Sequence, residues 1–109
     1  MHLITFAHWP EARAFTDHFS PKRHSQYDWL YECQQIVIII TGEGIHEAIS
    51  KTAFTLGLYP QITDIYNFGV AGSLDENLSL HQIKEIRTIY AFDSKPLFKS
   101  FTLPGTTDL

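Results

Sequence analysis

The chain has 109 residues, of which 44% are hydrophobic and 14% aromatic, and its formal net charge is −4. This composition is typical of one globular domain and excludes an intrinsically disordered chain. The acidic balance and the lack of a basic cluster argue against a nucleic-acid partner. Cys33 is the single cysteine, which excludes an internal disulfide and favours a reducing compartment.

Neither a membrane span nor a targeting signal is evident in the sequence. The longest apolar run, IVIII at residues 36–40, is too short to cross a bilayer. Residues 1–13, MHLITFAHWPEAR, lack the cationic start, the long apolar stretch and the small-residue cleavage site of a signal peptide. We therefore expect a cytoplasmic protein with no membrane partner.

The chain begins with a strand and a helix. Residues 2–7 (HLITFA) are short, apolar and β-branched, which predicts a strand. Residues 9–19 (WPEARAFTDHF) predict a helix, because Pro10 suits its first position and Glu11 suits its positive end. Ser20-Pro21 then closes this helix.

Two strands and a second helix follow. Residues 27–32 (YDWLYE) alternate as a strand with one wetter side, and residues 35–41 (QIVIIIT) predict a strand covered on both faces. Apolar and small residues after residue 44 recur at helical spacing, and we expect Gly57 to end this helix and Pro60 to prevent its resumption. The expected core stripe of this helix is Ile45, Ala48, Ile49, Thr52, Ala53 and Leu56.

The remaining chain is less regular. Residues 63–68 (TDIYNF) predict a strand, and residues 73–82 are polar and irregular. Residues 83–93 (IKEIRTIYAFD) predict a long strand, which its charges place near a sheet edge. The tail from residue 94 shows no clear period.

This order of elements predicts an α/β fold with a mixed, partly parallel sheet flanked by helices. We expect residues 1–109 to form a single domain. Five strands share only two helices, although a sheet buried on both faces needs a cover on both. Either a second chain pairs with this one, or the domain continues past Leu109.

Two glycine turns follow predicted strands, Gly42-Glu43-Gly44 and Gly69-Val70-Ala71-Gly72. In open α/β sheets, ligands bind beyond the carboxyl ends of strands, and glycine lets a ligand approach the backbone. The alternative is that each glycine only permits a tight turn. Glu11 lies in the loop after the first strand, where it could accept a proton from water or only complement the helix dipole.

Three segments in this order, LITFAHWPEARAF, IVIIITGEGIHEAI and IYNFGVAGSL, resemble the N-terminal half of the nucleoside phosphorylase superfamily. The similarity covers roughly residues 1–93. It is greatest to the hydrolase branch, the methylthioadenosine/S-adenosylhomocysteine nucleosidases and futalosine hydrolases. Members share an Asn-x-Gly-x-Ala-Gly turn, which is residues 67–72 in this chain.

The resemblance implies a role for each matching position in the first and last of these turns. Glu11 matches the glutamate that orients the attacking water or binds a ribose hydroxyl. Ala71 and Gly72 match the pair that borders the base and the ribose. Gly69 begins that turn, and Val70 stands where many members have serine, so a hydroxyl contact is missing here.

Other positions carry weaker implications. Gly42 and Gly44 match the turn before the family's second helix, whose role is structural or anion-binding. Trp9 could stack on a bound sugar or base, or could cap the first helix hydrophobically. The six histidines show no His-x-x-x-His spacing, so we expect no metal. We also expect no cofactor.

The sequence departs from the family in three ways. His81-Gln82 replaces the usual Gly-Asp, and AHWPEAR lacks the glycine of the phosphate-binding Gly-x-Pro-x-Arg pattern, with Arg13 one residue late. Hydrolysis is therefore expected over phosphorolysis. Family members are roughly twice as long, and their second half supplies a Met-Glu pair and the aspartate that protonates the leaving purine. Asp93 and Asp108 do not occupy a matching context.

Two functional hypotheses remain open. The first is a purine nucleosidase that cleaves the N-glycosidic bond. Its activity is expected to be low in this short chain, because the reaction needs a protonated leaving group and the family's second half supplies the acid. The second is a non-catalytic module that binds nucleosides or pairs subunits. The resemblance implies a homodimer, for which Phe98 and Phe101 are candidate contacts; their alternative is packing on the chain's own sheet.

Overall fold

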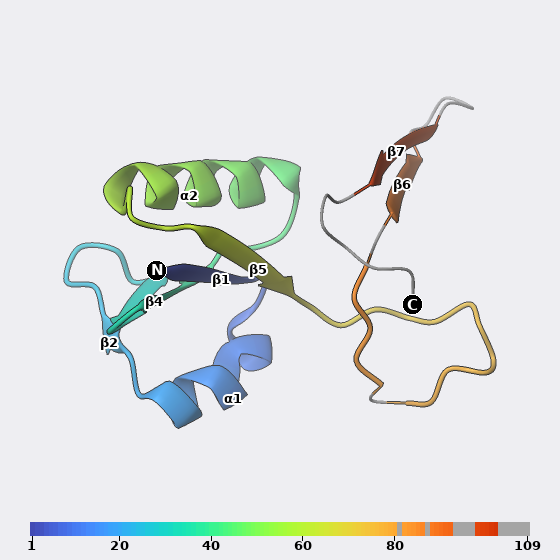
Figure 1. Ribbon diagram of the computed structural model, residues 1–109, viewed down its shortest axis with the longest axis horizontal. Coiled ribbons are helices and arrows are strands. Elements are labelled where there is room, and N and C mark those ends of the chain that lie inside the picture. Colours follow the sequence, from blue (N-terminus) through green and yellow to red (C-terminus); the bar gives the residue numbers. More distant parts are fainter. Residues whose placement is uncertain (81, 87, 93–97, 103–109) are drawn as a thin grey trace. The chain divides into compact units, whose positions relative to one another are not determined.

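The computed structural model describes residues 1–80, 82–86, 88–92 and 98–102, with the backbone alone for residues 90–92 and 98–102. The chain divides into two compact units, Met1–Ala71 and Gly72–Leu109, here called the N-terminal unit and the C-terminal unit (Figure 1). No described helix is both long and apolar enough to cross a bilayer.

The N-terminal unit is an α/β structure, as the sequence predicted. Its elements are β1 (His2–Phe6), α1 (Trp9–Phe19), β2 (Lys22–Arg23), β3 (Leu30–Cys33), β4 (Ile36–Ile40), α2 (Ile45–Leu58) and β5 (Asp64–Phe68). The sheet has the order β2-β3-β4-β1-β5, in which β1 is parallel to β4 and β5, whereas β3 is antiparallel to β2 and β4. The sheet is therefore mixed and partly parallel.

The two helices lie on opposite faces of this sheet (Figure 1). Successive side chains of a strand point to opposite faces, so the apolar strands β1 and β4 supply both cores. On the α1 face, the buried cluster is Ile4, Phe6, Ala12 and Ile38. On the α2 face, it is Leu3, Leu30, Val37, Ile39 and Tyr59.

The predicted bounds of α1 are confirmed. Pro10 lies in its first turn together with Glu11, and Ser20 ends the helix in the left-handed region with φ 48° and ψ 51°. The backbone N–H of Ser20 donates to the carbonyl of Thr16 at 2.9 Å, which satisfies one of the last helical carbonyls.

The end of α2 and its core face differ from the prediction. Gly57 does not end the helix, which continues to Leu58 with Tyr59 as its C-cap. Tyr59 is buried against the core, and the glycine within the helix costs about 1 kcal/mol relative to alanine.

The sheet-facing stripe of α2 is rotated relative to the predicted one. Thr55 is fully buried and Leu56 packs against the α2-face core, whereas Ile45 and Ile49 are 73% and 62% exposed. Ala53 is exposed as well. The helix therefore presents a row of apolar residues away from the sheet.

Strand bounds also differ from those predicted. β3 begins at Leu30, because Asp28 and Trp29 form a turn, and β2 was not predicted. In the C-terminal unit, β6 (Thr88–Phe92) pairs antiparallel with β7 (Phe98–Thr102). The predicted strand at residues 83–93 was therefore too long at its start, and β7 lies in the tail that showed no period.

Some sequence predictions lie outside the described residues. These are the interpretations of His81, Asp93 and Asp108, and of the side chains of Phe98 and Phe101.

Candidate functional site

The turns that follow β1, β4 and β5 lie at one end of the sheet. Phe6 pairs with Ile40 on one side and with Phe68 on the other, so the three parallel strands end together. The backbone N–H of Gly42 donates to the carbonyl of Ala7 at 3.0 Å, which joins the first two turns. We call this end of the sheet the rim.

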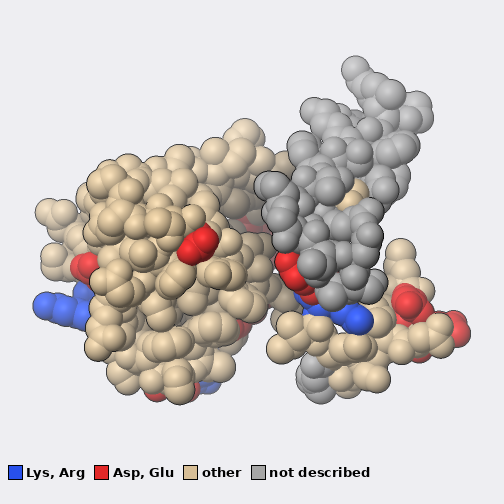
Figure 2. Space-filling model, in the orientation of Figure 1, with Lys and Arg blue, Asp and Glu red and all other residues tan. Residues whose placement is uncertain are grey.

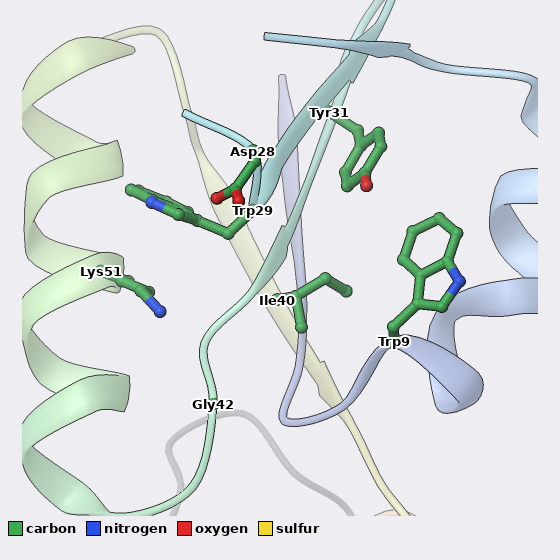
Figure 3. A pocket seen from close by; sticks show the side chains of 7 residues that line it. All are labelled: Trp9, Asp28, Trp29, Tyr31, Ile40, Gly42 and Lys51. Carbon is green, nitrogen blue, oxygen red and sulfur yellow. The ribbon is translucent and has the colours of Figure 1, made fainter. Parts of the chain in front are cut away.

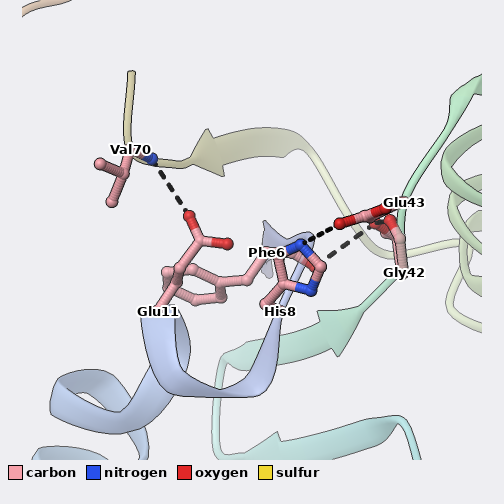
Figure 4. Close-up of polar contacts among 7 residues, drawn as sticks. Phe6, His8, Glu11, Gly42, Glu43 and Val70 are labelled. Carbon is pink, nitrogen blue, oxygen red and sulfur yellow. Dashed lines mark hydrogen bonds and ion pairs between the residues drawn. The ribbon is translucent and has the colours of Figure 1, made fainter. Parts of the chain in front are cut away.

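Glu11 reaches from α1 to the turn after β5. Its Oε2 accepts a hydrogen bond from the backbone N–H of Val70 at 3.1 Å (Figure 4). Ala71 is the next residue, is exposed, and ends the N-terminal unit. The structure thus brings the acid predicted from the first turn to Gly69 and Val70 of the glycine turn, whereas Gly72 begins the C-terminal unit.

The backbone conformation at positions 69 and 72 does not require glycine, because neither residue has a positive φ angle. Positive φ angles among the described glycines occur at Gly42 and Gly44. A Cβ atom added at Gly69 would lie 3.5 Å from Oε2 of Glu11, an ordinary van der Waals contact. Glycine at position 69 therefore leaves the backbone bare beside the carboxylate.

The turn after β4 has a clear structural role. Gly42 and Gly44 have φ angles of 83° and 92°, which L-residues with side chains rarely adopt. Gly44 is the N-cap of α2, and its carbonyl accepts the N–H of Ala48 at 3.1 Å. Lys51 donates to the carbonyl of Thr41 at 3.1 Å and holds the turn against the helix. This geometry explains both glycines without a ligand.

An ion pair that the sequence did not suggest crosses the rim. Nε2 of His8 lies 3.0 Å from Oε1 of Glu43, with the two side chains 50% and 81% exposed. Figure 4 shows that His8 points toward Glu43 whereas Glu11 points toward Val70. The pair therefore links the first two turns on the side away from the Glu11 carboxylate. Its only sequence signal was the presence of both residues in the turns after β1 and β4.

Trp9 is directed away from the Glu11 contact. Its ring stacks on Tyr31 of β3, with centroids 5.2 Å apart and an interplanar angle of 29°. Trp9 and Gly42 line the same hollow, to which neither Glu11 nor Val70 contributes. Glu11 and Trp9, two residues for which the sequence suggested a ligand contact, therefore belong to separate groups on the rim: Glu11 lies with the β5 turn and Trp9 with the β4 turn.

Neither a raised pKa nor a group of metal-binding side chains marks the rim among the described residues. The pKa of Tyr59 is raised to about 12 by burial and by the neighbouring Glu32 carboxylate, but this residue caps α2 and packs in the core. Among the described residues, no group of three or more His, Cys, Asp or Glu side chains could hold a metal ion.

Comparisons with protein-family models, with curated proteins and with solved structures found no match. The functional interpretation therefore depends on the chemistry of the rim and on the sequence motifs.

Proposed function

We propose that the rim binds a purine nucleoside and that Glu11 positions a water molecule for hydrolysis of its N-glycosidic bond. The hydrogen bond between Glu11 and Val70 carries this proposal. It places a carboxylate beside a glycine turn whose motif resembles the base- and ribose-binding turn of nucleosidases. We further propose that the protein acts in the cytoplasm, needs no cofactor and forms a homodimer.

Attack of the water molecule on the ribose requires only one chemical step. The water oxygen forms a bond to C1′ of the ribose and releases a proton to the Glu11 carboxylate, while the bond between C1′ and the base nitrogen breaks and the base takes up a proton from solvent. One oxygen of Glu11 is held by the Val70 N–H, so the other is available to orient the water. We assign no general acid among the described residues, and such an acid contributes about 10²–10⁴ in rate. The expected turnover is accordingly slow.

A purine-release assay tests the proposal. Methylthioadenosine and adenosine are incubated with the wild-type chain, with Glu11→Gln and with Glu85→Gln, and free purine is measured. Glu85 is exposed in the C-terminal unit, so its variant removes the same charge at a distance from the rim in sequence. Slow release by wild type and Glu85→Gln, with at least about a tenfold loss in Glu11→Gln, is expected.

Two results would contradict hydrolysis by Glu11. Equal release by wild type and Glu11→Gln would remove this residue from the mechanism. No release from either nucleoside would leave only the binding hypothesis, which calorimetry with methylthioadenosine then tests. The absence of a binding heat at millimolar nucleoside would exclude a nucleoside-binding site of ordinary affinity.

A second candidate function is a non-catalytic module that pairs subunits. Its support is the exposed apolar row of α2, in which Ile45 and Ile49 are 73% and 62% exposed. Few charged side chains lie over the face of the N-terminal unit seen in Figure 2. Large exposed apolar patches mark interaction sites. Light scattering measures the molar mass of wild type and of an Ile45→Lys/Ile49→Lys double variant and so tests this role. A monomeric wild type would exclude it.

A further inference from the structure

An open hollow of about 300 Å³ lies in the N-terminal unit, beside the turn after β4 (Figure 3). Its walls include three aromatic side chains, Trp9, Trp29 and Tyr31, together with the carboxylate of Asp28 and the ammonium group of Lys51. We call it the aromatic hollow. Trp29 and Lys51 lie on one side of it, and Trp9 and Tyr31 lie on the other (Figure 3).

The aromatic rings favour a positive charge. The face of an aromatic ring is electronegative and attracts cations within about 6 Å of its centroid. The chain already makes one such contact, because Nζ of Lys51 lies 5.6 Å from the ring centroid of Trp29. On the opposite wall, Trp9 is stacked on Tyr31 and remains 41% exposed.

The charges of the hollow are not balanced. Lys51 is neutralised by Glu47, whose Oε2 lies 3.3 Å from Nζ, and Lys51 also donates to the carbonyl of Thr41. Asp28 is exposed, and no hydrogen bond or ion pair joins its carboxylate to another described residue. The hollow therefore carries one unpaired negative charge next to three aromatic side chains.

We propose that the aromatic hollow binds a small organic cation of the quaternary-ammonium or methylated-amine class. Aromatic rings surround the methyl groups of such cations, and a carboxylate supplies the opposite charge. The hollow is open and has a volume of about 300 Å³, which limits its occupant to a small molecule. The proposal is independent of nucleoside hydrolysis, because Glu11 and Val70 do not line the hollow.

The chain supplies its own reporter for this site. Its two tryptophans, Trp9 and Trp29, both line the hollow, so intrinsic tryptophan fluorescence responds to its occupant. Choline and tetramethylammonium are titrated against 3,3-dimethylbutan-1-ol, the neutral isostere of choline, and against adenine. Calorimetry of the same titrations detects binding that leaves the fluorescence unchanged. Saturable binding of the cations, about tenfold tighter than that of the neutral isostere, is expected.

Two matched variants separate the carboxylate from general charge effects. Asp28→Asn removes the unpaired charge, and the exposed Asp17→Asn on α1 removes an equal charge away from the hollow. Cation affinity is expected to fall about tenfold in Asp28→Asn and to stay at the wild-type level in Asp17→Asn. Circular dichroism checks that both variants fold.

Several results would overturn the proposal. These are equal binding of choline and its neutral isostere, equal cation affinity in wild type and Asp28→Asn, and no heat or fluorescence change with cations up to about 10 mM. Binding of adenine without binding of either cation would identify a stacking site for neutral rings instead. None of these results bears on purine release by Glu11.

Discussion

The carboxylate of Glu11 accepts the backbone N–H of Val70 at 3.1 Å, across 59 positions of sequence. The bond joins the first turn of α1 to the turn after β5, two segments that approach each other because β1 and β5 are parallel neighbours. Glu11 thus holds the glycine turn while the turn fixes the direction of its carboxylate. A mutation at either end is expected to affect the other.

Loss of the Glu11 side chain should free the Val70 amide. In Glu11→Ala, this amide loses its acceptor, and its hydrogen-exchange rate, measured by nuclear magnetic resonance, is expected to rise about three- to tenfold. Glu11→Gln keeps a side-chain oxygen that can accept the bond, so the rate should stay close to that of wild type. An unchanged rate in Glu11→Ala would mean that the bond contributes nothing to the order of the turn.

The arrangement of the rim was predictable from sequence, but the direction of its side chains was not. Parallel strands separated by crossover helices bring their carboxyl ends together, so the turns containing Glu11, Gly42 and Gly69 could be placed at one edge. The side on which Trp9 lies depends on Tyr31, a residue of an antiparallel strand whose register the sequence does not specify. The His8–Glu43 pair joins two loops and has no periodic pattern that could reveal it.

The contact between His8 and Glu43 is ionic only when the imidazole is protonated, and it should then contribute little to stability and depend on salt. Both side chains are at least half exposed, and exposed pairs contribute about 0.2–1 kcal/mol. A double-mutant cycle with His8→Ala and Glu43→Ala, followed by urea unfolding, measures their coupling. The coupling energy should fall toward zero in about 1 M salt, where the Debye length is about 3 Å. A salt-independent coupling would show that the contact is not mainly electrostatic.

The glycines of α2 should respond to alanine in opposite directions. Gly57 lies inside the helix, and apart from its chain neighbours and the nearby helix backbone no atom lies within 4 Å of an added Cβ, so Gly57→Ala should stabilise the protein by about 0.5–1 kcal/mol. Gly44 has equal space but a φ angle of 92°, so Gly44→Ala should destabilise it through backbone strain of about 1–3 kcal/mol. Thermal unfolding of the pair measures both effects, and a stabilising Gly44→Ala would contradict this assignment of strain.

The buried face of α2 could not be read from its apolar residues alone. Periodicity placed Ile45 and Ile49 toward the sheet, but burial of Thr55 turns these isoleucines outward. Thr55 satisfies its hydroxyl by donating to the carbonyl of Lys51 at 2.7 Å, so a polar residue can occupy the core position without an unpaired group. Hydrophobicity thus identified the helix but could not orient it.

The turn between β3 and β4 contains a strained residue. Gln34 has a φ angle of 51°, in the left-handed region, which costs about 1–2 kcal/mol for residues other than glycine. Gln34→Gly should therefore raise the free energy of unfolding by up to about 1 kcal/mol. The neighbouring Gln35 has no positive φ angle, so Gln35→Gly serves as the control and should be neutral or destabilising. Equal effects of the two substitutions on urea unfolding would contradict relief of strain.

Tyr59 should make the fold sensitive to alkaline pH. Its hydroxyl has a pKa of about 10 in an unfolded chain, whereas burial and the Glu32 carboxylate raise the pKa to about 12 in the folded protein. The folded state therefore retains the phenolic proton more strongly. The resulting contribution to stability is complete below about pH 10 and is lost as the pH rises toward 12.

The measurement is urea unfolding at about pH 9 and about pH 11 for wild type, Tyr59→Phe and Tyr66→Phe. Wild type should lose stability over this interval, and Tyr59→Phe should lose less because it has no phenol to ionise at the core. Tyr66 is 48% exposed, so its variant should follow the wild-type decline. If Tyr59→Phe declines as steeply as wild type, the alkaline sensitivity arises elsewhere. In that case, the burial of Tyr59 between the end of α2 and β3 does not control the alkaline limit of the fold.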